Sequence, residues 1–506
     1  MRLINDIFVW FLKRRIERIE FFRDNPVETQ QRIFSELITT AKDTVWGQKY
    51  AYKSILTEAD YKNRVPISSY EDLFPEIERI LKGEENILWP SETKWFAKSS
   101  GTTNARSKYI PISPEALEDC HYMGGRDVMT LFLHNRPETN IFDGKGLSIG
   151  GSLHANPYNN LTKVGDVSAI ITKNLPPWAE FIRTPPVEVA LLDKWEDKLE
   201  KMAELCQQEN VTSILGVPTW VIVLLDRILE TTGKKNILEI WPNFEVFVHG
   251  AVNFQPYREL FIHKYFPANH IQYLETYNAS EGCFAIQDDL SKVGEMLLML
   301  DYGVYYEFIP MDEFDREQPR TLTLDEVEID QNYAIIISTN AGLWRYKIGD
   351  TVKFTSKYPF RIKVSGRTKH FINAFGEELV IENADEAVTY ACEATDALLV
   401  DYTAGPVYIG DGSNGRHEWV IECAIEPSKQ AEFIEKLDQK LREVNSDYDA
   451  KRYKGLALLA PIVHFVPQGT FYEWLAKKGK LGGQHKVPRL SNSREYVEDI
   501  LDIIKK

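Results

Sequence analysis

Hydrophobic residues recur at helical spacing through the first 90 residues. Asp6 and the basic residues 13–15 interrupt the first apolar face, so residues 4–19 are too polar to span a bilayer. We expect this amphipathic helix to pack against the protein itself, and we predict no membrane partner. The helical pattern continues from 26 to 90, with breaks expected at Pro26, Pro66 and Pro75.

From about residue 194 the pattern alternates between helical periodicity and short apolar runs. Helices are expected at 195–205, 220–229 and 257–265, and strands at 211–215, 244–248 and 271–274. Such alternation predicts a largely parallel sheet covered on both faces.

Between about 282 and 365, short strands separated by Gly, Asp and Asn turns predict a β-rich subdomain. After residue 366 the pattern changes to strands at 397–402, 419–425 and 462–466 around a helix at 433–444. We therefore predict an α/β protein with mostly parallel sheets and a β-rich subdomain in an N-terminal domain (1–365). A small α+β domain (366–506) is expected to follow.

Composition narrows the possible functions. Apolar residues make up 43% and charged residues 26%, which are values of a globular protein. The net charge of −16 and the lack of a long basic block argue against a nucleic-acid partner. Five widely spaced cysteines without a C-x-x-C pair indicate reduced thiols, so we expect a cytoplasmic protein with no disulfide framework and no zinc site.

The segment from Ser99 to Lys108 is rich in groups that bind phosphate. Hydroxyl groups, a glycine and a lysine within ten residues can surround a polyphosphate with O–H donors, backbone N–H groups and a positive charge. It is not a P-loop, because Arg106 stands where the second glycine belongs. An ordinary Ser/Thr turn is the alternative interpretation.

Two later segments carry further candidate chemistry. Tyr277 and Glu281 follow the strand expected at 271–274, where a tyrosine ring can stack on adenine and a carboxylate can hold Mg²⁺. Asp350 is expected after a glycine turn, where its carboxylate can accept both hydroxyls of a ribose. Without further context a surface turn aspartate would be the simpler interpretation of Asp350.

The three segments occur in the order and spacing of the adenylate-forming superfamily, which includes acyl-CoA synthetases and luciferase. In detail SSGTT with a following lysine, YNASE and YKIGD resemble the auxin-responsive Gretchen Hagen family of acyl-acid-amido synthetases, from about residue 95 to 490. The resemblance implies the adenylate-forming ligase fold with a mobile C-terminal domain. It also implies that a small carboxylic acid is activated with ATP and Mg²⁺ and passed to an amine, expected to be an amino acid.

The resemblance assigns roles residue by residue. It implies catalytic roles for Lys486, within a segment similar to Q-Y-K-x-P-R, and for Glu281 as the Mg²⁺ ligand. Lys369 lies where the superfamily keeps its hinge. The residues implied to bind ATP are Ser99, Ser100, Gly101, Thr102, Thr103, Lys108, Gly250, Ala251, Tyr277, Ser280, Asp350 and Arg367. The residues implied to line the acyl pocket are His121, Arg126, Val167 and Ser168.

The chain also departs from the plant pattern. Asn104 and Ala105 stand where plant members usually have glycines. Lys347 stands where arginine is commoner, and a lysine keeps the positive charge but cannot form the bidentate hydrogen bonds of an arginine. We therefore expect a bacterial-type member.

Two other enzyme classes remain open. Residues 146–150 match the G-x-S-x-G nucleophile elbow of serine hydrolases, but Pro157 and three asparagines make the following segment a poor helix, which the elbow requires. An acyl-CoA ligase, which forms a thioester after the same adenylation step, is harder to separate from an amide-forming ligase by sequence.

Overall fold

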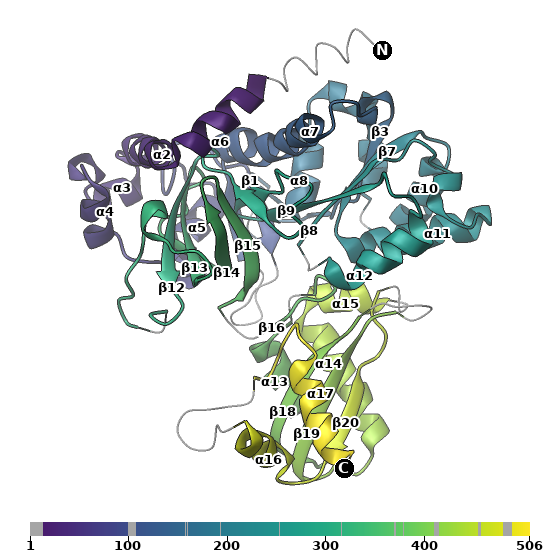
Figure 1. Cartoon of the computed structure of the whole chain (residues 1–506). Coiled ribbons are helices and arrows are strands. Elements are labelled where there is room, and N and C mark those ends of the chain that lie inside the picture. Colours follow the sequence, from purple (N-terminus) through teal and green to yellow (C-terminus); the bar gives the residue numbers. More distant parts are fainter. Residues whose placement is uncertain are drawn as a thin grey trace.

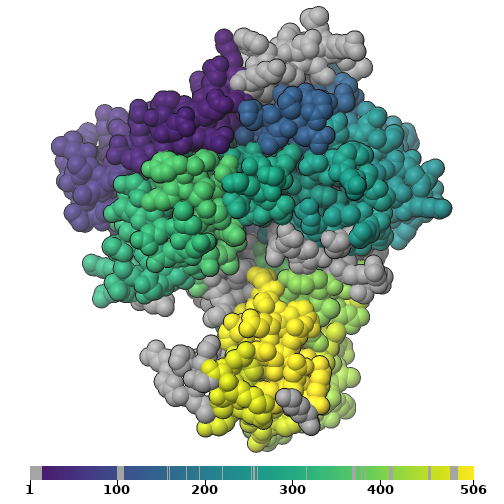
Figure 2. Space-filling view, in the orientation of Figure 1, coloured from purple at the N-terminus to yellow at the C-terminus, as the bar shows by residue number. Residues whose placement is uncertain are grey.

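A large α/β body carries a separate, smaller domain at its C-terminal end (Figure 1). The structure is a computed structural model that describes residues 14–505 except 100–107, 157, 159, 193, 252–253, 315, 369–370, 378, 409–413, 454–456 and 479–487. Figure 2 shows the C-terminal domain, in yellow and light green, below the body.

The N-terminal helices pack against the body. Residues 14–24 are helical, and Ile19 and Phe22 are buried in the main core, whereas residues 4–13 of the predicted first helix lie outside the described residues. The side chain of Gln30 donates to the carbonyls of Leu300 (2.9 Å) and Val304 (3.0 Å), which fixes the next helix against a distant strand. The elements of this region are α2 (Pro26–Ala41), α3 (Val45–Lys49), η1 (Tyr52–Ser54), α4 (Glu58–Arg64) and α5 (Tyr70–Leu81).

The expected break at Pro75 is wrong, because α5 runs through this residue. A capping box between Ser69 and Asp72 fixes the start of the helix, and its apolar face is buried in the core. Pro75 lies on the exposed side, so the Glu71 carbonyl that loses its helical donor is on the solvent side. The breaks at Pro26 and Pro66 are confirmed, since α2 begins at Pro26 and α4 ends at Arg64.

One sheet of eleven strands runs through the body in the order β12-β13-β14-β15-β11-β10-β9-β8-β7-β3-β6. From β9 to β6 neighbouring strands are parallel, whereas from β12 to β9 they are antiparallel. The predicted parallel sheet and the predicted β-rich subdomain are therefore two halves of one sheet. Its strands are β3 (Lys145–Ser148), β6 (Arg183–Thr184), β7 (Val211–Gly216), β8 (Val246–Gly250), β9 (Gln272–Ala279), β10 (Gly282–Ile286), β11 (Met296–Leu298), β12 (Val304–Pro310), β13 (Asn332–Thr339), β14 (Tyr346–Lys357) and β15 (Phe360–Arg367).

Helices cover the parallel half and a small second sheet lies beside it (Figure 1). The second sheet has the order β2-β1-β5-β4, with strands β1 (Trp95–Ser99), β2 (Lys108–Ile112), β4 (Leu153–His154) and β5 (Lys163–Gly165). The helical elements are α6 (Pro114–Ala116), η2 (Leu117–Tyr122), α7 (Met123–Asn135), η3 (Ile141–Asp143), α8 (Val167–Lys173), η4 (Pro177–Phe181), α9 (Val187–Ala190), α10 (Trp195–Cys206), α11 (Pro218–Thr232), η5 (Ile237–Glu239), α12 (Gln255–Leu260), η6 (Phe261–Tyr265) and η7 (Leu324–Glu326).

The C-terminal domain has its own sheet, in the order β18-β19-β20, and the strands and helix expected there are present. Apolar side chains of this domain, including Phe375 and Tyr448, are buried in one cluster with side chains of α11 and α12. The elements are β16 (Phe371–Ile372), β17 (Leu379–Val380), α13 (Ile381–Ala394), β18 (Leu398–Val407), β19 (Arg416–Ile425), α14 (Gln430–Val444), α15 (Ser446–Arg452), β20 (Ile462–Val466), α16 (Thr470–Lys477) and α17 (Glu495–Ile504).

All five cysteines are buried and unbridged. Within the described ranges, none of the helices combines the length and the apolar character that a bilayer crossing needs.

Candidate active site

Tyr277 and Asp350 meet in the interior, although three strands separate β9 from β14 in the sheet order. The Tyr277 hydroxyl donates to Oδ2 of Asp350 at 2.6 Å, and each residue is 7% exposed. The Tyr277 ring also packs against Phe284, with centroids 5.1 Å apart. The hydroxyl therefore fixes the Asp350 carboxylate, and stacking of this ring on adenine stays a prediction.

Asp350 lies inside a strand rather than after a turn, so that sequence expectation is wrong. Strand β14 is continuous from Tyr346 to Lys357, and its pairing with β13 skips residues next to Gly349. Gly349 has a φ of +95°, which favours glycine, and it forms part of an irregularity of the strand rather than a loop. The backbone of Asp350 pairs with that of Arg367 on β15.

Glu281 lies in the turn of the β9–β10 hairpin, beside Ser280, and both are half-buried. The Tyr346 hydroxyl, from the start of β14, donates to Oε1 of Glu281 at 3.4 Å. Burial raises the pKa of Tyr346 well above its usual value, so its hydroxyl keeps the proton and remains a donor. Searched over the described part of the chain, no cluster of three or more His, Cys, Asp or Glu residues could hold a metal by itself.

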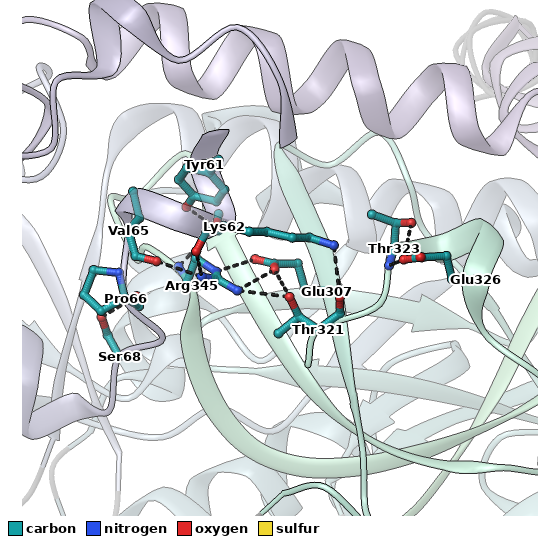
Figure 3. A network of polar contacts seen from close by, with 11 residues as sticks. Tyr61, Lys62, Val65, Pro66, Ser68, Glu307, Thr321, Thr323, Glu326 and Arg345 are labelled. Carbon is teal, nitrogen blue, oxygen red and sulfur yellow. Dashed lines mark hydrogen bonds and ion pairs between the residues drawn. The ribbon is translucent and has the colours of Figure 1, made fainter. Parts of the chain in front are cut away.

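Arg345 holds the strand that carries Tyr346 and Asp350 (Figure 3). Its Nε and Nη2 donate to both carboxylate oxygens of Glu307 at 3.0 and 2.9 Å, and Nη2 also donates to the Thr321 hydroxyl at 3.0 Å. Nη1 donates to the carbonyls of Lys62 (2.9 Å) and Val65 (2.7 Å). All five donors of the guanidinium are therefore used, and they join α4 and Val65 just after it to Glu307 on β12 and to Thr321.

The backbone beside Arg345 is fixed in the same way. The carbonyl of Arg345 accepts from Ser68 N at 2.9 Å, and Lys347 N donates to the Ser68 carbonyl at 2.8 Å. Tyr346 thus lies between two hydrogen bonds to one residue of the N-terminal region. Sequence reasoning missed Arg345 and Tyr346. The run Trp344–Arg345–Tyr346 inside a β-rich segment was the available signal.

The Ser/Thr segment connects two paired strands. Ser99 ends β1 and Lys108 begins β2, and these residues are register partners, so the segment leaves and re-enters the sheet at one point. Ser100, Gly101, Thr102 and Thr103 lie outside the described residues. The Lys108 ammonium lies 5.7 Å from the centroid of the Tyr70 ring.

The Gly250–Ala251 turn ends β8 and touches β9. A Cβ at Gly250 would lie 2.5 Å from the Thr276 carbonyl oxygen, so only glycine fits at this crossing. Ala251 is exposed and has a φ of +68°. The preceding residue, His249, is buried, and burial, followed by the charge of Arg258, lowers its pKa to about 3, so its ring is neutral at pH 7.

The residues expected to line the acyl pocket fall on three helical segments, η2, α7 and α8. His121 is buried on η2, and burial lowers its pKa to about 4, so its ring is also neutral at pH 7. Val167 and Ser168 begin α8, which packs against η2 and β1, and the Ser168 hydroxyl accepts from Gly151 N at 2.9 Å. Arg126 lies on the exposed side of α7, where its Nη2 is 2.9 Å from the Met123 sulfur.

Lys486 and Lys369 lie outside the described residues. The chain just after Lys486 is anchored on β18 of the C-terminal domain. The Thr403 hydroxyl donates to the Pro488 carbonyl at 2.7 Å, and Ala404 N donates to the Arg489 carbonyl at 2.8 Å.

The nucleophile elbow expected of a serine hydrolase is not built at Ser148. Strand β3 ends at this residue, and the next regular element is the two-residue strand β4 instead of a helix. The Ser148 hydroxyl accepts from Nη2 of Arg183 at 3.3 Å.

Family models match most of the chain. The GH3 family N-terminal domain matches residues 15–271, the GH3 family central domain matches 297–367, and the GH3 family C-terminal domain matches 382–495. Among curated relatives, indole-3-acetic acid-amido synthetase GH3.3 of Arabidopsis thaliana is 23% identical and covers 93% of this chain and 90% of its own. The 4-substituted benzoates-glutamate ligase GH3.12 of the same plant is also 23% identical, covering 98% and 97%.

Solved structures show the same fold. AtGH3.15 acyl acid amido synthetase in complex with 2,4-DB has a TM-score of 0.62 at 16% identity and covers 97% of this chain and 96% of its own. A 2-hydroxyisobutyryl-CoA ligase, solved with 2-HIB-AMP and CoA in the thioesterification state, has a TM-score of 0.57 at 12% identity, covering 95% and 92%.

Replacing Arg345 should destabilise the large domain. Arg345→Ala leaves the carboxylate of Glu307, which is 1% exposed, without its counter-ion, and breaking such a buried pair costs about 3–5 kcal/mol. The measurement is urea unfolding, followed by tryptophan fluorescence. Arg320→Ala is the matched control, because the exposed Arg320 pairs only loosely with Glu313 at 3.6 Å, and its loss should stay within about 0.5 kcal/mol. Equal losses in the two variants would contradict the anchoring role.

Proposed function

The chain belongs to the GH3 family, and we propose that it is an ATP-dependent ligase that adenylates a small carboxylic acid and transfers the acyl group to an amino acid. The observation that carries the proposal is a pair of contacts, the buried Tyr277–Asp350 bond and the partly buried Tyr346–Glu281 bond, which join the β9–β10 hairpin to strand β14. The full-length likeness to amido synthetases and the adenylate-forming fold support it. From the departures at Asn104, Ala105 and Lys347 we further propose a bacterial-type member.

The nucleotide would lie across the ends of β8 and β9. Asp350, held by Tyr277, is the ribose acceptor, and the Gly250–Ala251 turn gives adenine room because it carries no large side chain. Tyr277 is proposed to border adenine, with Ser280 and Arg367 beside the nucleotide. Ser99 and Lys108 fix the two ends of the phosphate-binding segment, whose other proposed ligands are Ser100, Gly101, Thr102 and Thr103.

Glu281 suits a magnesium ion bound together with ATP. Mg²⁺ is usually held by one or two carboxylates together with substrate phosphates, and a half-buried carboxylate at a hairpin turn provides one such ligand. Tyr346 orients this carboxylate by donating to one of its oxygens. When bound, the ion neutralises phosphate charge and polarises the phosphoryl group.

The acid would bind near η2 and α8. His121 is neutral, so it can exchange a hydrogen bond with a polar group of the acid but does not attract its carboxylate by charge. Val167 contributes apolar surface next to Ser168, and Arg126 is proposed at the outer margin of the same region. These residues favour an acid with an apolar body.

We place the domain boundary at residue 366 and the hinge near Lys369. Lys486 would approach the α-phosphate in one position of the C-terminal domain, and in a second position this domain would turn so that the amine reaches the acyl carbonyl. The anchoring of residues 488–489 on β18 supports this, because Lys486 then moves with the domain.

A CoA ligase is the second candidate. The likeness to 2-hydroxyisobutyryl-CoA ligase favours it only at the level of the fold. The two candidates share adenylation and differ in the acceptor.

A suitable carboxylic acid should trigger exchange of labelled pyrophosphate into ATP, because adenylation is reversible. We expect exchange with at least one member of a panel of aryl, indolyl and short aliphatic acids, and an amide mass when amino acids are added. A thioester formed only with CoA would select the second candidate. Absence of exchange with every acid of the panel would contradict both candidate functions.

Asp350→Ala should raise the KM for ATP. Two ribose hydroxyls lose a charged acceptor worth about 1.5–3 kcal/mol per bond at most, which corresponds to about 10- to 150-fold for one bond. Tyr277→Phe is the matched control, because it keeps the ring and removes only the hydroxyl that orients Asp350, so its effect should be smaller. An unchanged KM in a folded Asp350→Ala protein would leave Asp350 a purely structural residue.

Lys486→Ala should nearly abolish adenylation while leaving acyl transfer largely intact. Removing one preorganised donor from a developing oxyanion costs about 2.7–4 kcal/mol, or roughly 100- to 1,000-fold in kcat. Pyrophosphate exchange measures the first half-reaction, and amide formation from supplied acyl-AMP measures the second. Severe loss in both would rule out the two positions of the C-terminal domain.

A further inference from the structure

We propose that Lys451 is a positioning residue that latches the C-terminal domain onto the body by placing its ammonium group on the face of Trp220. The latch itself is a statement about domain docking. Its catalytic consequence rests on the proposed ligase function.

The contact joins two domains through a buried cation. Lys451 lies on α15 and is 4% exposed, and its Nζ is 3.9 Å from the centroid of the Trp220 ring on α11. Tryptophan is the strongest aromatic partner for a cation, and the attraction grows when water is excluded. The Trp220 ring is itself packed against Trp195, with centroids 4.3 Å apart, so the surface that receives Lys451 is fixed on the body.

The Lys451–Trp220 contact lies at the same edge of the sheet as the Gly250–Ala251 turn. Strand β7 ends at Gly216 and α11 begins at Pro218, so Trp220 stands at the carboxyl end of a parallel strand, next to the end of β8. In the same interface Tyr257 OH donates to the Ala374 carbonyl, and Asn373 Nδ2 donates to the Ala251 carbonyl at 3.4 Å. The contacts of Lys451 and of the β16–β17 hairpin therefore form one interface at this edge.

The hairpin and Lys451 are parts of one rigid surface of the C-terminal domain. Gly376 has a φ of +85°, and a Cβ there would lie 3.4 Å from the Lys451 Nζ, so the hairpin turn and the ammonium touch. The fully buried Glu377 carboxylate accepts from Phe375 N (2.7 Å) and contacts Nε2 of His417 (2.7 Å), which ties the turn to β19. Movement of the domain must therefore carry the hairpin and the ammonium together.

The Lys451–Trp220 contact stabilises one of the two proposed positions of the C-terminal domain over the other. In this structure Asn373 of the hairpin reaches the Gly250–Ala251 turn, while residues 488–489 follow β18, so we assign the latched arrangement to acyl transfer. Turning the domain toward adenylation must separate Lys451 from Trp220. Loss of the ammonium should therefore favour adenylation at the expense of transfer.

The test compares Lys451→Met, which keeps the chain but removes the charge, with Lys451→Arg, which retains a cation. Docking is measured directly by energy transfer between dyes on cysteines introduced at the exposed positions Lys429 and Lys94, since the native cysteines are buried. The ratio of docked to undocked protein should fall about 10- to 30-fold in Lys451→Met, and Lys451→Arg should restore most of it. Lys440→Met is the control, because the Lys440 ammonium lies near Tyr390 within the same domain.

Activity gives a second readout. In Lys451→Met amide formation from supplied acyl-AMP should fall about tenfold while pyrophosphate exchange is unchanged or faster. Trp220→Leu should reproduce this split, and adding Lys451→Met to it should cause little further change. Unchanged docking in Lys451→Met, or equal loss in both half-reactions, would overturn the latch. If docking changes in Lys451→Met but the protein acts on no carboxylic acid, the docking role of Lys451 is supported and the proposed ligase function is refuted.

Discussion

The guanidinium of Arg345 is the constraint on which the site depends. Its residue adopts a φ of +44°, a conformation that costs energy for any side chain other than glycine and persists only when its surroundings hold it. Five hydrogen bonds of the guanidinium stabilise this conformation, and they connect α4 with Glu307 on β12 and with Thr321. Because Tyr346 is the next residue, the same bonds set where its hydroxyl meets Glu281.

The candidate site lies where the two halves of the sheet join. Strand β9 pairs with β8 in parallel and with β10 in antiparallel fashion, so it belongs to both halves. The Gly250–Ala251 turn comes from the parallel half, and Asp350 comes from the antiparallel half. A nucleotide bound here would contact both. The C-terminal domain packs on α11 and α12, and it also contacts the Gly250–Ala251 turn through Asn373.

The sequence predicts the helices and strands whose apolar residues recur at regular spacing. It does not predict features that depend on the tertiary contacts of a single residue. The strands and helices from 211 to 274 and those of the C-terminal domain have the apolar spacing expected of them. The helix break expected at Pro75 is wrong because burial of the apolar face of α5 outweighs the loss of one backbone hydrogen bond. The turn expected at Gly349 is wrong because a glycine with positive φ also fits an irregular strand. The Tyr277–Asp350 bond and the bonds of Arg345 to Lys62 and Val65 could not be predicted, since they join residues 73, 283 and 280 positions apart. The roles of the candidate residues stay predictions.

The anchoring of the N-terminal helices has a consequence for biosynthesis. Gln30 donates to the carbonyls of Leu300 and Val304, and Arg15 donates to Asp301, so these three hydrogen bonds span 270 or more residues. At about 5–20 residues per second the ribosome needs roughly 15–60 s to make that stretch. During this interval the surface that β12 provides is missing. Earlier segments cover the first helices only in part, as where the Phe34 ring packs against Tyr61, so the nascent chain is a substrate for chaperones until β12 emerges.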